Sequence, residues 1–127
     1  MRRKREASQT LTKSELEVMK ILWAQGESCD VHEIIDSYEE PKPAYTTVST
    51  FLKILQHKGY VGFERGRGKQ YMYFPVVSHD DYTRFALQDL KHHFFGGSTS
   101  SFISFFVKEE KLSEEEIAEL LQMIQNQ

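Results

Sequence analysis

The chain has 127 residues, of which 39% are hydrophobic and 28% are charged. This length suits one compact domain, or one domain with a small appendage, and the composition is ordinary for a soluble globular protein. No apolar run approaches the roughly 20 residues that a membrane span needs. The opening MRRKREASQT is basic but has no apolar segment after it, so we expect no secretory signal and a cytoplasmic protein.

The net charge of −3 hides an uneven distribution. Residues 1–75 hold 12 Lys and Arg against 10 Asp and Glu, whereas residues 76–127 hold 4 against 9. Residues 42–71 hold six basic residues and a single acidic one, Glu64. Phosphate binding depends on local positive potential, so this segment is compatible with a nucleic-acid partner. A solvated charged surface has the same composition, and the clustering on its own leaves both interpretations open.

The predicted elements begin with a flexible basic arm at 1–10 and two short helices. Thr12 and Glu15 have the spacing of a capping box, so a first helix is expected to begin there. Ser28 is the expected cap of a second helix. The prolines in 41–43 prevent that helix from continuing. The apolar positions of the second helix are Val31, Ile34, Ile35 and Tyr38.

A third helix and a hairpin form the strongest pattern in the chain. The helix is expected over about 45–58, and Gly59 ends it. Strands are expected at 60–65 and 70–75, because apolar and polar residues alternate there around a Gly-Arg-Gly turn. A helix followed by a basic hairpin is the order found in a winged helix-turn-helix. The apolar stripe of the helix is Val48, Phe51, Leu52 and Leu55.

The remainder of the chain is predicted to be helical. Ser78, His79 and Asp80 are candidate caps of a helix that Gly96-Gly97 ends. An apolar segment follows at 102–107, and Ser113 with Glu116 forms a second capping box before a final helix. The expected fold class is therefore mainly α with a small two- to three-stranded antiparallel sheet. A winged helix-turn-helix would occupy 11–76, and C-terminal helices would occupy 77–127.

The third helix carries a hydroxyl-rich face opposite its apolar stripe. Hydroxyls can bond to phosphates or base edges, and a helix N-terminus favours an anion. The basic hairpin tip suits phosphates or a minor groove. Neutral surface hydroxyls and a solubilised hairpin end are the alternative, but the two preceding helices favour DNA. Tyr71 and Tyr73 are interpreted as core residues rather than as stacking platforms for RNA. The candidate DNA contacts are Thr46, Thr47, Ser49, Thr50, Lys53, Arg65, Arg67 and Lys69.

Aromatic residues are unusually frequent in the C-terminal half. Three short helices cannot bury so many rings, so a partner is expected, most simply a second copy of the chain. Residues 77–127 are therefore predicted to be a dimerisation domain, and 11–76 a DNA-binding domain. The alternative is a monomer in which the rings pack back on the winged helix. The rings concerned are Phe94, Phe95, Phe102, Phe105 and Phe106.

Enzyme chemistry has little support in the sequence. The histidines are scattered, and the spacing of Cys29 and His32 lacks the second pair that a zinc site requires. Neither a glycine-rich phosphate loop nor a nucleophile elbow occurs. Cys29 is the one cysteine, so it cannot form an intramolecular disulfide. We expect no catalytic activity, no cofactor and no metal.

The third helix and the hairpin contain the segments AYTTVSTFLKILQHKGYV and RGRGKQYMYFPVVSHDDY. These segments resemble the penicillinase-repressor family of bacterial transcriptional regulators. LTKSELEVMKILWAQG is similar to the first helix of that family, and the spacing of Gly96, Gly97, Phe102, Phe106 and Leu112 resembles its C-terminal half. The resemblance extends over about 11–124.

The resemblance implies a homodimeric winged-helix repressor that binds a palindromic operator. Base contacts would come from Tyr45, Thr46, Thr47, Ser49 and Thr50, and a phosphate contact from Lys53. The wing contacts would be Arg65, Arg67 and Lys69. The C-terminal helices would dimerise, with an interface at Phe94, Phe102, Ile103, Phe106, Ile117, Leu120, Leu121 and Ile124.

The resemblance also implies a route to derepression. In the antibiotic-resistance branch, a membrane-bound sensor protease triggers cleavage in the helix before the final one. The matching bond is Phe105–Phe106, and Phe105 stands where that branch has Asn. The cysteine motifs of the copper-responsive branch are missing near the C-terminus, so metal sensing is not expected. Two alternatives stay open: a winged-helix module that binds proteins, and a ligand-responsive regulator with a pocket under the C-terminal aromatic residues.

Overall fold

The computed structural model describes residues 10–126, so the arm expected at 1–10 lies, apart from Thr10, outside the described residues. The chain divides into two compact units, Met1–Ala86 and Leu87–Gln127. Their junction falls inside the helix α5 (His79–Phe95), whereas the sequence places its domain boundary where that helix begins. The functional division into a DNA-binding and a dimerisation domain stays a prediction.

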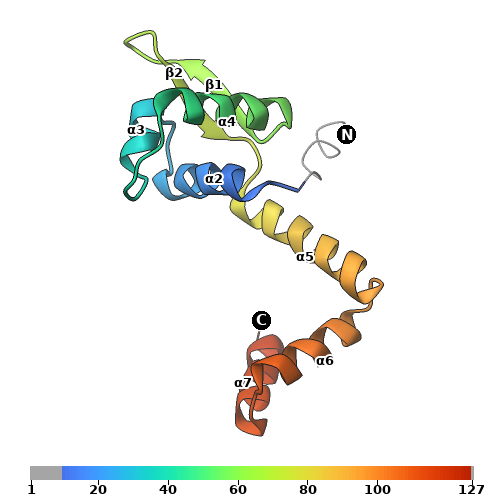
Figure 1. The fold of residues 1–127 in the computed structure, drawn as a ribbon. Helices are drawn as coiled ribbons and strands as arrows, with labels where there is room; N and C mark the ends of the chain where they lie inside the picture. The colour runs from blue at the N-terminus through green and yellow to red at the C-terminus, as the bar shows by residue number, and fades with distance from the viewer. Residues whose placement is uncertain (1–9, 127) are drawn as a thin grey trace. The chain divides into compact units, whose positions relative to one another are not determined.

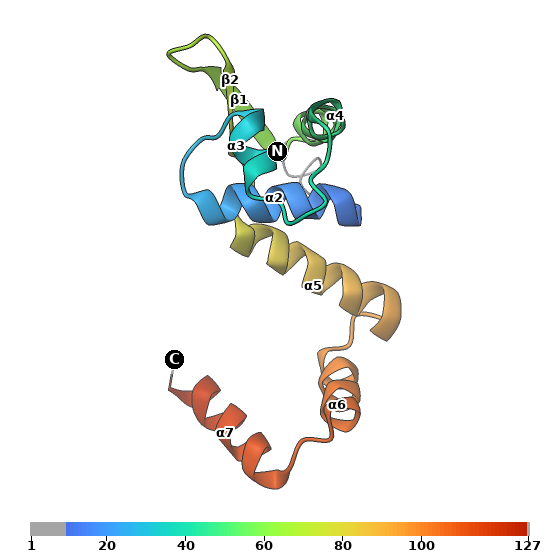
Figure 2. The ribbon, with the colours of Figure 1, turned by 60° about the vertical axis from the view of Figure 1, so that its left-hand side comes forward.

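The described part of the first unit combines helices with a β-hairpin (Figure 1). In this unit α4 packs against both α2 and α3, and Figure 2 views α4 nearly along its axis. This arrangement confirms the predicted fold class, a winged helix-turn-helix that is mainly α with a small antiparallel sheet. The elements are α2 (Lys13–Gln25), α3 (Val31–Asp36), α4 (Tyr45–His57), β1 (Val61–Arg65) and β2 (Tyr71–Pro75), followed by the start of α5.

The hairpin is anchored to the segment that joins α2 and α3. Its strands pair antiparallel, with Phe63 opposite Tyr73 and Arg65 opposite Tyr71. The N–H of Cys29 donates to the carbonyl oxygen of Tyr73 at 2.9 Å, and the N–H of Tyr73 donates back to Cys29 at 2.7 Å. This bridge adds one residue of a third strand to the sheet and joins the middle of β2 to the residue just before the N-cap of α3.

The helix caps show where local sequence signals hold and where they fail. The capping box of Thr12 and Glu15 is present as predicted. The second helix, however, is capped by Asp30 rather than by Ser28. The prediction failed because Cys29 lies between the two residues and pairs with the hairpin, which requires extended backbone. At its other end α3 stops at Asp36, so that Tyr38, expected on the apolar side of this helix, lies beyond it.

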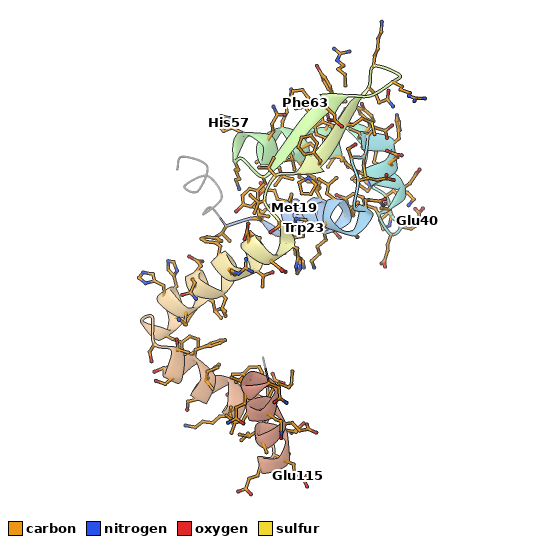
Figure 3. The ribbon with its side chains drawn as sticks, turned by 180° about the vertical axis from the view of Figure 1, so that it is seen from behind. Met19, Trp23, Glu40, His57, Phe63 and Glu115 are labelled. Carbon is orange, nitrogen blue, oxygen red and sulfur yellow. The ribbon has the colours of Figure 1, made fainter. Side chains whose placement is uncertain are left out.

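The core of the first unit lies between the three helices and the hairpin. Two hydrogen bonds also join the start of α5 and the segment just before it to the α2 region. The indole N–H of Trp23 donates to the carbonyl oxygen of Val77 at 2.9 Å, and the N–H of Leu11 donates to the Tyr82 hydroxyl at 3.1 Å. Met19 and Trp23 are labelled in Figure 3. The largest fully buried side chains are Val18, Met19, Leu22, Ile34, Val48, Leu52, Leu55 and Tyr60.

The second unit contains the end of α5, then α6 (Thr99–Glu110) and α7 (Glu114–Gln125). Gly96 and Gly97 have φ values of 57° and 81°, a left-handed conformation that glycine adopts readily and that ends α5. The capping box of Ser113 and Glu116 opens α7 as predicted. Neither α6 nor α7 contains a fully buried residue, so local caps define these helices more than a core does.

A partly buried ion pair joins the two longest helices of the winged helix. The Lys58 ammonium at the end of α4 lies 2.8 Å from a carboxylate oxygen of Glu15 in α2. The backbone N–H of Thr12 donates to the same oxygen at 3.0 Å. The Glu15 side chain is almost fully buried, whereas Lys58 keeps some contact with water. The pair therefore satisfies a carboxylate that the core could not otherwise hold in charged form.

Replacing Lys58 by Met should destabilise the protein more than replacing Glu15 by Gln. Lys58→Met leaves a buried carboxylate without its cation, and we expect the free energy of unfolding to fall by about 3 kcal/mol. Glu15→Gln leaves a cation that water can reach, so its effect should be smaller. Chemical denaturation measures both, with the exposed Lys20→Met as control. Equal effects of Lys58→Met and Lys20→Met would contradict the role of the pair.

The same pair should make stability depend on pH in the acidic range. Burial raises the pKa of Glu15, but the hydrogen bonds from Lys58 and Thr12 and the charge of Lys58 outweigh it and hold the pKa below its ordinary value of 4.5. Because the folded-state pKa is the lower one, the stabilisation is present above pH 4.5 and is lost as the pH falls through the folded value. Denaturation curves at several acidic pH values should therefore show a shallower pH dependence for Glu15→Gln than for the wild type.

Candidate nucleic-acid interface

The exposed face of α4 is the first part of the candidate site. Val48, Leu52 and Leu55 are buried, so the rest of the helix surface is available. The hydroxyl of Thr50 donates to the carbonyl oxygen of Thr46 at 2.9 Å, which leaves its lone pairs free to accept. Of the predicted contacts on this helix, Ser49 is half-buried, and the exposed ones are Tyr45, Thr46, Thr47, Thr50 and Lys53.

The N-terminus of α4 is open to an anion. Ala44 occupies the N-cap position, and no side chain accepts a hydrogen bond from the helix there. The backbone N–H groups of the first turn therefore keep their donor capacity, and the helix dipole favours negative charge beside them. Ser, Thr, Asp and Asn are the preferred residues at this position, and α2, α3 and α7 of this chain are capped by Thr12, Asp30 and Ser113. The open end thus distinguishes α4 chemically from its neighbours.

The hairpin tip presents two of its three predicted cations. The N–H of Gly66 donates to the carbonyl oxygen of Gln70 at 2.8 Å and closes the turn. The Arg65 guanidinium folds back over the ring of Tyr71, 4.9 Å from its centroid, and donates to the carbonyl oxygen of Lys69 at 3.1 Å. Arg65 therefore braces the tip. The side chains of Arg67 and Lys69 are exposed there.

Two other cations of the basic segment serve the fold itself. The Lys42 ammonium donates to the carbonyl oxygens of Ile35, Asp36 and Tyr38 and so caps the C-terminal end of α3. Lys58 pairs with Glu15. Both belong to the six basic residues counted in 42–71. Their side chains are bound by other groups of the winged helix, and composition alone cannot reveal such contacts. The positive charge available to a partner is correspondingly smaller and more localised.

An exposed group of aromatic rings on the hairpin was missed by the sequence analysis. Tyr73 is buried as predicted, but Tyr71 is 44% exposed, and Phe63 at the centre of β1 is 42% exposed. The rings of Phe63 and Tyr71 are 4.8 Å apart. The predicted core position of Tyr71 is therefore wrong. The pairing of the strands could have indicated this group of rings. Phe63 lies opposite Tyr73 and Arg65 lies opposite Tyr71, so all four side chains share one face of the hairpin.

Cys29 is the potentially nucleophilic thiol of the first unit, and it is buried. Burial, together with the nearby carboxylates of Glu33, Glu27 and Asp30, raises the pKa of the Cys29 thiol and so disfavours a nucleophilic thiolate. Within residues 10–126, no cluster of three or more His, Cys, Asp or Glu side chains is placed to bind a metal ion. None of the helices in these residues is both long and apolar enough to cross a bilayer.

The second unit exposes three of the five aromatic residues that the sequence singled out, Phe94, Phe105 and Phe106, and leaves Phe95 and Phe102 half-buried. Phe94 is 74% exposed and Ile124 is 67% exposed. Rings from α5 and α6 surround an apolar groove of about 650 Å³, with Glu109 and Glu110 at its edge. Of the predicted interface residues, Phe102 and Ile117 are half-buried, and the exposed ones are Phe94, Ile103, Phe106, Leu120, Leu121 and Ile124.

A helix-turn-helix with an open recognition helix and a basic hairpin defines a winged-helix protein. Residues 11–126 match the family model described as penicillinase repressor, and the chain belongs to that family of transcriptional repressors. It is 28% identical over 116 residues to the penicillinase repressor of Bacillus licheniformis, covering 91% of this chain and 89% of that protein. It is also 27% identical over 121 residues to an uncharacterised 16.5 kDa protein from the ptsI 3′ region of Latilactobacillus sakei, covering 94% and 81%.

The structural role of Lys42 can be separated from that of an available cation. Lys42→Met removes a charged donor from three carbonyl groups, and we expect the free energy of unfolding to fall by about 1 kcal/mol. Lys53→Met removes an exposed charge and should change stability by less than about 0.5 kcal/mol. Thermal or chemical denaturation of the two variants makes the comparison. Indistinguishable stabilities would show that the Lys42 cap contributes nothing.

Proposed function

We propose that this protein is a transcriptional repressor that binds a palindromic operator in double-stranded DNA as a homodimer. The observation that carries the proposal is the pairing of an uncapped, hydroxyl-lined α4 with a basic hairpin tip in one unit. A helix of this kind fits a major groove, and a basic tip suits phosphates or an adjacent minor groove. Membership of a repressor family supports the same conclusion.

The proposed contacts fall into three groups. Base edges would be read from the first two turns of α4, and a phosphate would be bound by Lys53. Arg67 and Lys69 would reach the DNA from the hairpin tip, and Arg65 would hold the tip in shape as well as add charge. The base-reading residues in this proposal are Tyr45, Thr46, Thr47, Ser49 and Thr50.

The homodimer is proposed from the exposed apolar face of the second unit. Soluble monomers rarely expose so many large apolar side chains together, and a second copy covers such a face without requiring another gene product. A two-fold dimer would present two α4 helices to half-sites roughly 34 Å apart, or a multiple of that distance. Each half would bind weakly alone, and linkage would raise the effective concentration of the second half. Loss of the dimer would therefore release the operator.

Proteolysis at Phe105–Phe106 is one proposed route to that loss. Both side chains lie in α6 and are exposed, so a protease can reach the segment. The bond itself is in helical backbone, so cleavage requires local unwinding of α6. Cutting there would separate α7 and the end of α6 from the remainder of the apolar face. A membrane-bound sensor protease is the proposed agent.

Binding to DNA should be specific and strongly dependent on salt. The purified protein is titrated against its own upstream intergenic DNA at 50 and 200 mM salt, with random DNA as competitor. If each site neutralises about six phosphates, affinity should fall by roughly 10³-fold between the two salt concentrations. Two chains should bind each site. Weak salt dependence with no preference over random DNA would instead favour a winged-helix module that binds proteins.

Disrupting the apolar face should weaken operator binding without touching the DNA-contacting unit. Phe106→Asp places a charge on the face and should yield monomers with at least tenfold weaker operator binding. Ser104→Asp adds the same charge to α6 at an exposed polar position and serves as the matched control. Analytical ultracentrifugation and the DNA titration measure the two properties. Tight operator binding by a proven Phe106→Asp monomer would refute the linkage.

A further inference from the structure

A hollow of about 260 Å³ lies in the first unit between α3, α4 and the hairpin. One wall is the wing-facing stripe of α4, formed by Tyr45, Ser49 and Lys53 on successive turns. The other wall is the aromatic face of the hairpin, formed by Phe63 and Tyr71. The hollow therefore has hydroxyl and cationic groups on one side and aromatic rings on the other.

The aromatic wall is held in place by its own contacts. The ring of Phe63 lies 4.8 Å from that of Tyr71 and 6.2 Å from that of the buried Tyr73. The Arg65 guanidinium lies over Tyr71. Phe63 and Tyr71 nevertheless remain almost half exposed, so packing in the core does not explain why these positions carry large aromatic rings. Figure 3 labels Phe63 on the hairpin. Rings that are fixed but uncovered are suited to pack against an apolar surface of a partner.

The polar wall begins at the open end of α4. The ring of Tyr45, its first residue, lies 5.1 Å from that of His32 in α3. Lys53 is exposed two turns further along. Asp30 also borders the hollow, but its carboxylate accepts the N–H of Glu33 at 2.9 Å as the cap of α3. The Lys53 ammonium thus favours an anion at its end of this wall, and the uncapped first turn of α4 favours one at the other end.

The place of the hollow in the proposed complex indicates what it holds. If α4 enters a major groove and the hairpin tip reaches the adjacent minor groove, the DNA backbone between those grooves must pass between them. That ridge consists of alternating phosphates, which need cations and donors, and deoxyriboses, which offer C–H groups. The two walls of the hollow match these two components, and contacts of this kind fix register without reading sequence.

We propose that the hollow binds one deoxyribose-phosphate unit of the operator backbone, with Phe63 and Tyr71 packing on the sugar and Lys53 binding the phosphate. This inference rests on the proposed function, and it adds two aromatic residues that the candidate contacts did not include. The binding contribution of the rings is apolar and independent of base sequence. The contribution of Lys53 is electrostatic.

The two contributions can be separated by their salt dependence. Phe63→Ala should weaken binding roughly tenfold on operator and random DNA alike, because a half-exposed ring is lost, while the salt slope stays unchanged. Lys53→Met should lower the slope of log K against log salt by about 1. Tyr71→Ala removes the second ring and should weaken binding to both kinds of DNA in the same way. Unchanged binding of Phe63→Ala, or a loss confined to the operator, would overturn the proposal.

A second measurement needs no variant and therefore does not depend on how Phe63→Ala folds. Hydroxyl radicals attack the sugars of DNA, so a buried deoxyribose appears as a protected position. The wild-type complex should protect a sugar in each half-site, between the positions contacted by α4 and by the hairpin tip. If the wild type binds DNA with steep salt dependence but that sugar stays reactive, the hollow is not a backbone site. If the wild type does not bind DNA at all, the proposed function itself fails.

Discussion

The position of α4 depends on the ion pair between Glu15 and Lys58, which ties the end of that helix to the start of α2. Apolar packing of Val48, Leu52 and Leu55 decides which face of α4 is buried. The ion pair adds a second constraint, because moving the cation away would leave an unpaired charge in the core. The N-terminus and the hydroxyl face of α4 belong to the same helix, so the proposed DNA contacts share both constraints.

Much of the local structure could be predicted because its causes are local. The boxes at Thr12 and Ser113 involve residues three positions apart, and the sequence alone specifies them. The start of α3 depends instead on the pairing of Cys29 with Tyr73, which are distant in the chain. The residues near the cap do not reveal this distant pairing, so Ser28 was predicted as the cap instead of Asp30. A helix start was thus predicted correctly where the interacting residues are close in the sequence, and wrongly where they are far apart.

The candidate site shows the same division at the level of single side chains. The exposed face of α4 followed from one helical period, and the structure leaves Thr46, Thr47 and Thr50 exposed as that period requires. The roles of the cations did not follow, because a lysine count cannot distinguish a free ammonium from one that caps a helix or pairs with a carboxylate. Tyr71 was assigned to the core together with Tyr73 by strand alternation, which identifies a shared face but not whether the core extends far enough to cover it. Whether the core covers this face depends on how far α3 and α4 extend along the hairpin.

The second unit combines exposed apolar side chains, which attract a partner, with an excess of acidic residues, which repel another acidic surface. Residues 87–127 hold three Lys and Arg against seven Asp and Glu, and the same residues expose the apolar face of α5, α6 and α7. Apolar attraction alone is unselective, and exposed rings would bind many surfaces. Like charges around the face oppose any partner that does not bury enough apolar area to outweigh them, which is how repulsive elements produce specificity. In the proposed dimer, the acidic residues would therefore select for well-matched association. They would also repel DNA phosphates, so that the direct contacts to the operator come from the winged helix, while the second unit contributes by linking the two halves.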